Sequence, residues 1–374
     1  MAGIYFHIPF CQQACHYCNF FFTTSKRFIN LTTEAMLNEL EYRKDYLSGE
    51  TIQTIYFGGG TPSMLPPSEI QTLIDGVKNS FSVDSELEIT LEANPDNLTK
   101  PYLEELKKTD VNRFSIGIQS FHQDELLWMN RAHNSGEATR CLELVESYQY
   151  DHYSVDLILG IPISSREKWQ QNLDILSGFR PKHVSCYALT VEPKTALDYQ
   201  IKNGKSPAIK DTETEEQFYM AHDFLSKKGY KHYEISNYGL PGYAAKHNSS
   251  YWEGKKYLGI GPSAHSYNRE SRSWNIAHLP KYLEGVNKGQ LNLETENLSK
   301  VDQYNEFVMT NIRKSSGISL EILKQNFAEY IEHFDDSLLE IPKTFLNRKQ
   351  STISLSREGL MFADFVGSAL FFVV

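Results

Sequence analysis

The stretch Cys11-Gln12-Gln13-Ala14-Cys15-His16-Tyr17-Cys18 carries three cysteines with the spacing Cys-x-x-x-Cys-x-x-Cys. Iron–sulfur clusters are held by cysteine thiolates, normally four of them. Three thiolates on a four-iron cluster would leave one iron without a protein ligand, and such an iron can bind a small molecule. The spacing therefore favours a reactive cluster over a plain electron relay.

Other interpretations of these cysteines are weaker. A zinc site could use them with a histidine as fourth ligand, but structural zinc sites usually add a distant second ligand pair, and Cys141 and Cys186 are isolated. Surface thiols, or one disulfide plus a free thiol, are the remaining alternatives. Five cysteines are an odd, low number for 374 residues, which argues against a disulfide framework and for a reducing compartment.

The composition narrows the class of protein. Lys plus Arg number 37 and Asp plus Glu number 47, a net charge of −10, so we expect no nucleic-acid partner. The N-terminus has no basic segment followed by a long apolar one, so we expect no signal peptide and a cytoplasmic protein. The apolar end at 369–374 is too short to be a transmembrane segment, which leaves peripheral membrane contact open.

The first half of the chain alternates short β-branched runs with amphipathic helices, the pattern of parallel βα units. Six such units predict an α/β fold, a (β/α)6 partial TIM barrel that is open on one side. We expect its strands at residues 4–8, 54–57, 87–91, 113–118, 153–159 and 183–188. We expect its helices at 33–47, from Pro67 to 81, from Thr99, at 136–148, and from a capping box at Ser164 and Glu167.

The pattern changes after about residue 190. Tyrosine and asparagine become frequent, and helices at 213–228 and 299–314 stand apart. The last part predicts a helix at 320–327, a strand at 352–355 and a helix from Arg357, which together suggest a small helical, winged-helix-like domain. We therefore expect two domains: residues 1–290, the barrel with a mixed α/β extension, and residues 291–374, the C-terminal domain.

Residues with useful chemistry follow the predicted strands, and sites of parallel βα folds form at the carboxyl ends of strands. The cysteine loop follows the first strand, and glycines at 58–60 follow the second, where they let a ligand approach the backbone. No Lys-Ser or Lys-Thr follows these glycines, so this is not a phosphate P-loop. Glu92 and Gln119 end the next two strands.

Two charged residues complete this rim. Arg131 follows the fourth strand, and Asp156 lies within the apolar fifth strand, where an unpaired acid is costly. Taken alone, each could be a surface charge or a helix cap. Together they place an anion binder, an amine binder and hydroxyl binders around one edge.

With these motifs the chain resembles the radical S-adenosylmethionine enzymes, which share the cysteine spacing and the Gly-Gly-Gly-Thr-Pro run at 58–62. More narrowly, it resembles the oxygen-independent coproporphyrinogen III oxidase-like family. The supporting runs lie at residues 5–11, 57–62, 113–121 and 155–162.

The resemblance implies that Cys11, Cys15 and Cys18 hold a 4Fe–4S cluster whose open iron binds the methionine part of S-adenosylmethionine. Glu92 would lie near the amine of that ligand, and Arg131 would pair with its carboxylate. The implied S-adenosylmethionine site comprises Tyr5, Tyr17, Gly59, Gly60, Thr61, Glu92, Gln119, Arg131 and Asp156.

Two features separate the chain from the porphyrinogen-oxidising branch of that family. The oxidases carry a further cysteine where this chain has Phe20, and they have a long N-terminal segment before the first strand, which we expect here to begin almost at Met1. Whether the chain is an enzyme is left open, but Phe20 argues against porphyrinogen oxidase activity. The resemblance assigns no catalytic residue.

The run His247-Asn248-Ser249-Ser250-Tyr251-Trp252 instead resembles the signature of the HemW branch, whose members are proposed haem chaperones. A neutral imidazole is a good iron ligand, and Tyr251 and Trp252 offer flat apolar faces to a porphyrin. The alternative is that His247 is only a hydrogen-bonded strand-end residue and that Tyr251 and Trp252 are ordinary core. His265 is the second candidate haem ligand.

The resemblance thus implies a haem chaperone that binds haem as cargo and transfers it to an acceptor protein. A flavodoxin or ferredoxin would serve as reductant. The rival function is an oxygen-independent coproporphyrinogen III oxidase that decarboxylates propionates by a 5′-deoxyadenosyl radical. A third interpretation keeps the cluster but makes it a redox or regulatory module.

Overall fold

The computed structural model describes residues 1–373, and its largest feature is a twelve-stranded sheet in the order β12-β11-β10-β9-β1-β2-β3-β4-β5-β6-β8-β7. Seven neighbouring strands of this sheet, from β9 through β1 to β6, run parallel. They are β1 (Ala2–Ile8), β2 (Ile52–Gly59), β3 (Val83–Ala93), β4 (Arg113–Gln119), β5 (Tyr153–Leu159), β6 (His183–Ala188) and β9 (Lys256–Ile260).

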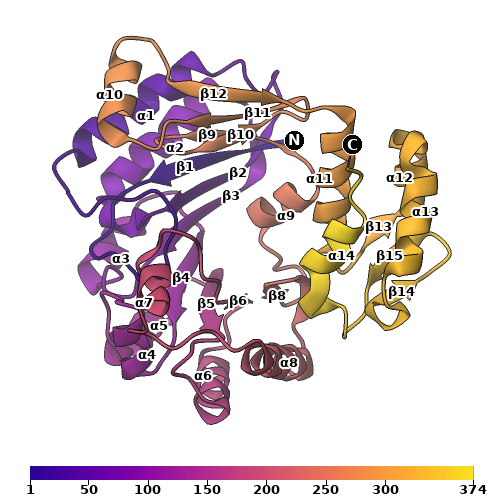
Figure 1. Ribbon diagram of the computed structural model, residues 1–374. Helices are drawn as coiled ribbons and strands as arrows, with labels where there is room; N and C mark the ends of the chain where they lie inside the picture. Colours follow the sequence, from indigo (N-terminus) through magenta and orange to yellow (C-terminus); the bar gives the residue numbers. More distant parts are fainter. Residues whose placement is uncertain (374) are drawn as a thin grey trace.

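Antiparallel strands extend both edges of the parallel set. Figure 1 shows β1 to β6 as a fan of strands, with helices α1 to α6 along one side. The edge strands are β7 (Lys231–Glu234), β8 (Asn237–Gly239), β10 (His265–Tyr267), β11 (Ser271–Asn275) and β12 (Leu293–Asn297). The helices of this part are α1 (Ile29–Tyr42), α2 (Pro67–Ser80), α3 (Lys100–Leu106), α4 (Gln123–Trp128), α5 (Ser135–Ser147), α6 (Arg166–Phe179), α7 (Ala196–Lys202), α8 (Asp211–Lys227), α9 (Lys246–Trp252) and α10 (Leu279–Asn287).

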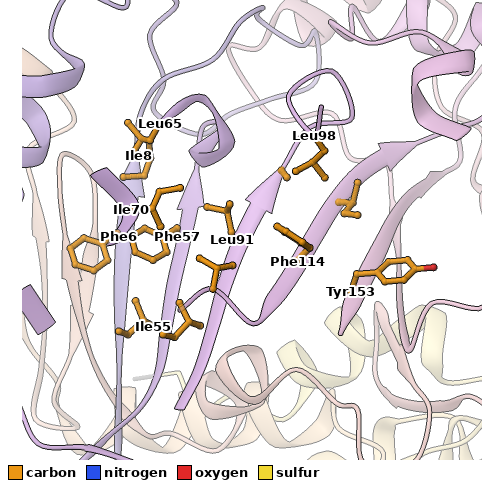
Figure 2. Packing of buried hydrophobic residues seen from close by; sticks show 14 of the residues in the cluster. Phe6, Ile8, Ile55, Phe57, Leu65, Ile70, Leu91, Leu98, Phe114 and Tyr153 are labelled. Atoms are coloured by element: carbon orange, nitrogen blue, oxygen red, sulfur yellow. The ribbon is translucent and has the colours of Figure 1, made fainter. Parts of the chain in front are cut away.

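The side chains of each strand alternate between two faces of the sheet. One face is apolar and packs under the helices: Phe6 stacks on Phe57, with 5.0 Å between the ring centroids, and Leu91 and Phe114 continue this core along the next strands (Figure 2). The other face carries polar and aromatic residues, beginning with Tyr5. The sheet thus buries one face for stability and leaves the other for the site.

The predicted α/β partial barrel is confirmed, and all six predicted strands are present. The parallel set has one more strand than we predicted. β9 comes after the irregular segment that follows residue 190, yet it returns to pair parallel with β1. A pairing between residues so distant in sequence leaves no local pattern.

Three helix boundaries differ from the prediction. α1 begins at Ile29 and ends at Tyr42, because the chain turns before the buried Leu47. The N-cap of α6 is Ser165, whose hydroxyl accepts a hydrogen bond from the Lys168 amide, and not the adjacent Ser164. The last helix does not begin at Arg357, because Ser356 forms a turn in which its hydroxyl accepts from the Gly359 amide at 3.1 Å.

The C-terminal region is helical, as predicted, with a small sheet and its own buried cluster that includes Val308, Phe334 and Val366. β12 still belongs to the main sheet, so that sheet passes the expected boundary at residue 290. We therefore propose that the second domain starts near residue 299. Its elements are α11 (Lys300–Ile312), β13 (Ile318–Ser319), α12 (Leu320–Asn326), α13 (Ile331–Glu340), β14 (Leu346–Arg348), β15 (Thr352–Leu355) and α14 (Ala363–Ala369).

Among residues 1–373, no helix combines the length and the apolar character that crossing a membrane requires.

A buried ion pair fixes the sheet extension to the barrel. Arg43 Nη1 donates to Glu39 Oε1 at 3.1 Å within α1, and both side chains are nearly inaccessible to solvent. Glu39 also accepts from the Gly261 amide at 2.9 Å and from the Tyr282 hydroxyl at 2.8 Å. Arg43 donates further to the carbonyl of Gly259 at 3.0 Å. The pair therefore connects α1 to β9, α10 and the loop after β9.

We expect Glu39→Ala to lower the free energy of unfolding by about 3–5 kcal/mol, because it leaves the buried guanidinium of Arg43 without its carboxylate. Urea denaturation followed by circular dichroism measures this loss. The matched control is Glu41→Ala, which breaks a solvent-exposed pair with Lys44 and should leave the free energy of unfolding nearly unchanged. Equal losses in the two variants would contradict the assigned role of Glu39.

Candidate functional site

A cavity of about 440 Å³ lies at the carboxyl ends of the parallel strands. It brings together residues from the loops after β1, β2 and β4 and from β3, β4 and β5. Of the residues predicted for the cluster and its ligand, all but Tyr5 line this cavity. They are Cys11, Cys15, Tyr17, Cys18, Gly59, Gly60, Thr61, Glu92, Gln119, Arg131 and Asp156.

The cysteine loop is held against the glycine loop by backbone hydrogen bonds. The Gly60 amide donates to the Ile8 carbonyl at 2.8 Å, and the Thr61 amide donates to the Phe10 carbonyl at 2.7 Å. A Cβ atom at Gly60 would lie 2.7 Å from the first of these oxygens and 2.8 Å from the second, so this approach requires glycine. The glycine run thus positions the cysteines as well as lining the cavity.

Two of the three thiols accept hydrogen bonds from side chains of the cavity wall. The Thr61 hydroxyl donates to Cys11 Sγ at 3.6 Å, and Arg131 Nη1 donates to Cys15 Sγ at 3.5 Å. The pKa of Cys11 is raised to about 11, chiefly by burial and to a lesser extent by the two neighbouring thiols, while the hydroxyl of Thr61 opposes this rise. Burial also raises the pKa of Cys18. These raised pKa values keep the free thiols protonated. A bound metal centre would lower them, because coordination deprotonates thiols.

The alternative of a structural zinc site asks for four ligands that converge on one ion. Within residues 1–373, no three His, Cys, Asp or Glu side chains are grouped closely enough to hold a single metal ion. A cluster distributes its thiolates over separate irons. Three partly exposed thiols around one loop fit that donor set.

Arg131 is fixed in the cavity wall by several acceptors. Its Nη2 donates to Asn94 Oδ1 at 2.6 Å and to the Gly117 carbonyl at 2.9 Å. Its Nε is buried and has no partner among the described residues. The guanidinium is therefore held rigidly beside Cys15 with a donor still free for an anionic group.

Two carboxylates line the same cavity as Arg131, from β3 and β5 on either side of β4. Glu92 Oε1 accepts from the Tyr56 hydroxyl at 2.7 Å, and Asp156 Oδ2 accepts from the Ser115 hydroxyl at 2.9 Å. Burial raises the pKa of Glu92 to about 7 and raises that of Asp156. Asp156 Oδ1 is buried without a partner in the described chain. Two poorly solvated acids make this part of the cavity a place for a cationic or hydroxyl-bearing ligand.

A backbone irregularity directs Gln119 into the cavity. The pairing of β4 with β5 shifts register between Gly117 and Gln119, and Gln119 has a φ of 66°. Left-handed backbone is uncommon for a residue other than glycine, and such positions cluster at ligand sites. The shift thus places a polar side chain at the rim, where regular pairing would continue the strand.

Tyr5 lies deeper in the barrel than we expected. Its ring stacks on Tyr56, with 6.1 Å between centroids, and its hydroxyl lies 3.3 Å from His7 Nδ1. The prediction missed Tyr56 and Asn94, which also line the cavity. Tyr56 donates a hydrogen bond to Glu92, and Asn94 accepts one from Arg131. The signal for Asn94 was its position two residues after Glu92, at the end of the same strand.

The two candidate haem ligands differ in accessibility. His247 is buried in α9 and is not at a strand end; its Nδ1 lies 2.7 Å from Thr54 Oγ1 and its Nε2 lies 2.8 Å from the Tyr251 hydroxyl. Burial, and to a lesser extent Arg113, lowers the pKa of His247 to about 3, so the ring is neutral. Both nitrogens are engaged, so binding an iron would require the loss of one hydrogen bond.

His265 is exposed on β10, and its ring stacks on that of Trp274, with centroids 5.6 Å apart. Phe20, the position of the additional cysteine in the oxidases, lines the cavity mouth with 64% of its surface exposed. Both side chains are accessible to solvent, in contrast to the buried His247.

Comparison with known proteins agrees with this geometry. The model of the radical SAM superfamily matches residues 5–176. Curated relatives are the proteins called heme chaperone HemW from Synechocystis, 30% identical over 99% of this chain and 96% of the relative, and from Bacillus subtilis, 29% identical over 99% of each. The same-named Escherichia coli protein is 36% identical over 70% of this chain and 69% of its own.

Among solved structures, the coproporphyrinogen III oxidase HemN from Escherichia coli is similar in fold. The TM-score is 0.84 over 99% of this chain and 90% of that one, at 19% sequence identity. At this identity the likeness concerns the fold alone.

Proposed function

The chain belongs to the HemW family of the radical SAM superfamily, and on this basis we propose that it is a haem chaperone that binds haem and transfers it to an acceptor protein. It would carry a 4Fe–4S cluster on Cys11, Cys15 and Cys18 and bind S-adenosylmethionine in the adjoining cavity. The observation that carries the proposal is that one cavity joins these three thiols to a partly buried guanidinium and two partly buried acids.

The residues present fit the cluster and its ligand. When bound, the cluster supplies an electron for cleavage of the sulfonium. Arg131 would hold the carboxylate of S-adenosylmethionine with its free Nε, and Glu92 would face the ammonium. Asp156 Oδ1 and Gln119 would accept and donate hydrogen bonds to the ribose. These groups are fixed by Asn94, Tyr56 and Ser115 before any ligand binds.

The chaperone role is favoured over the oxidase role by the position of Phe20. This residue leaves the cysteine loop with three thiols and an exposed aromatic ring at the cavity mouth. The similarity to HemW proteins also extends over the segment of His247, Tyr251 and Trp252. His247 and His265 are the candidate iron ligands.

We propose a flavodoxin or ferredoxin as reductant and a reducing, cytoplasmic setting. All five cysteines are free, and Cys141 and Cys186 are buried. Free thiols beside an oxygen-sensitive cluster would persist only under reducing conditions.

The cluster assignment predicts that Cys15→Ser abolishes the 4Fe–4S absorbance after anaerobic reconstitution, because the serine oxygen is a poor replacement for a thiolate. Ultraviolet–visible spectra with iron and sulfide determination measure the loss. Cys141→Ala, at a buried cysteine distant in sequence, is the matched control and should keep the full absorbance. Retention of the spectrum in Cys15→Ser would show that the ligand assignment is wrong.

The raised pKa of Glu92 predicts a pH-dependent affinity for S-adenosylmethionine. The pKa of Glu92 is about 7 in the site without ligand. The ammonium of bound S-adenosylmethionine favours the ionised carboxylate, so binding lowers this pKa. Affinity should be constant above about pH 7 and fall about tenfold for each pH unit below it. Calorimetry on the reconstituted protein at pH 6 and pH 8 measures the difference. Glu92→Gln should bind weakly at both; equal wild-type affinities would refute the assignment.

One paired assay separates chaperone from oxidase. The reconstituted protein, with reductant and S-adenosylmethionine, is given either haem or coproporphyrinogen III. We expect stoichiometric haem uptake and no vinyl product. Steady conversion of the porphyrinogen would defeat the chaperone proposal. His247→Ala and His265→Ala, compared by haem absorbance, identify the iron ligand, and a spectrum that is unchanged removes the substituted residue as a candidate.

A further inference from the structure

A second pocket, of about 430 Å³, lies at the amino ends of the barrel strands, opposite the cysteine loop. Residues at the start of β4, β5 and β6 and in β3 line it, together with the segment that leads into α9. We propose that this pocket binds a carboxylate and, on the function proposed above, that it receives a propionate of haem.

The first argument is the state of Arg113 at the pocket wall. Arg113 is only 6% exposed. Among the described residues, its side chain makes one hydrogen bond, from Nη1 to Thr90 Oγ1 at 3.4 Å. Within residues 1–373 it forms no salt bridge. A guanidinium has five N–H donors, and burying its charge without an anion is costly. Arg113 therefore keeps guanidinium donors available at the pocket wall, and the acids on which it acts from a distance, Glu92 and Asp156, line the other cavity.

Further unpaired or cationic groups surround Arg113. His183 is 2% exposed, and its Nδ1 is buried with no partner in the described part of the chain. Lys182 lines the same pocket with its Nζ 5.4 Å from the centroid of the Tyr243 ring. A planar guanidinium flanked by an ammonium group is well suited to a carboxylate, which accepts from both.

Two acids also line the pocket, and among the described residues neither forms a salt bridge with Arg113. Glu88 accepts from the backbone amides of Lys246 at 3.2 Å and His247 at 3.1 Å, so its charge is used to bind the start of α9. Glu86 has 86% of its side chain exposed, and its Oε2 pairs with Lys246 Nζ at 3.9 Å. Lys246 is thus paired with Glu86, and Arg113 and Lys182 are the basic side chains of the lining that form no salt bridge among the described residues.

The walls favour a carboxylate on a hydrocarbon arm over a bare anion. Tyr243 lines the pocket and packs edge-on against His152, with 5.0 Å between ring centroids. A haem propionate has this chemistry, a carboxylate at the end of two methylene groups. Lys246 begins the helix that carries His247, so the pocket adjoins the segment whose sequence resembles the HemW signature.

The test uses the full-length protein, titrated with haem, haem dimethyl ester and glutarate. We expect Arg113→Gln and Lys182→Gln each to weaken haem binding about tenfold or more, because each removes a charged hydrogen bond. The dimethyl ester, which lacks propionate charge, should bind the wild type as weakly as haem binds the variants. The matched control is Lys205→Gln, whose ammonium also lies over a tyrosine ring, that of Tyr199 at 5.7 Å, but outside this pocket.

Lys182→Gln decides the question if Arg113→Gln fails to fold. Wild-type affinity for haem in Lys182→Gln and in folded Arg113→Gln would overturn the proposal. If glutarate stabilises the wild type but not Arg113→Gln, while haem affinity is unchanged, the pocket serves a free carboxylate and the haem assignment is overturned. If the wild type binds no haem, the proposed function fails, and the glutarate comparison alone decides whether the pocket is a carboxylate site.

Discussion

The cavity depends on the contact between two loops, one ending β1 and the other ending β2. The Gly60 amide meets the Ile8 carbonyl at 2.8 Å, at a separation that a side chain on residue 60 would prevent. This contact puts the Thr61 hydroxyl 3.6 Å from the Cys11 thiol. The proposed metal ligands and the proposed cofactor site are thus fixed by the same backbone, so the position of one determines the position of the other.

Charge within the barrel is divided between its two ends. Glu92 and Asp156 face the cavity at the carboxyl ends of the strands. Arg113 lies at the wall of the pocket at their amino ends, and it lowers the pKa of both acids. Desolvation still dominates and keeps the pKa of Glu92 at about 7. The interior therefore presents a face for a cation at one end and a face for an anion at the other. A protein that handles a sulfonium nucleotide and a dicarboxylic porphyrin needs both.

The parallel strands and most of the site at their carboxyl ends could be predicted because they depend on local patterns. Apolar runs mark strands buried on both faces, and polar residues after those runs mark the rim. Tyr56 was missed because an aromatic residue in a strand resembles ordinary core. Glu39 and Arg43 were missed because a pair four residues apart on a helix resembles a surface ion pair. β9 and the hydrogen bonds of His247 depend on contacts between residues far apart in sequence, which no local pattern records.

The central claim is that three thiolates leave one iron open toward the cavity. The most direct measurement is the electron paramagnetic resonance spectrum of the reduced, anaerobically reconstituted protein, recorded with and without S-adenosylmethionine. Our account predicts a 4Fe–4S signal whose g-values change when the ligand is added, because the ligand binds the open iron. A signal unaffected by saturating ligand, or a protein that contains zinc in place of iron, would contradict it.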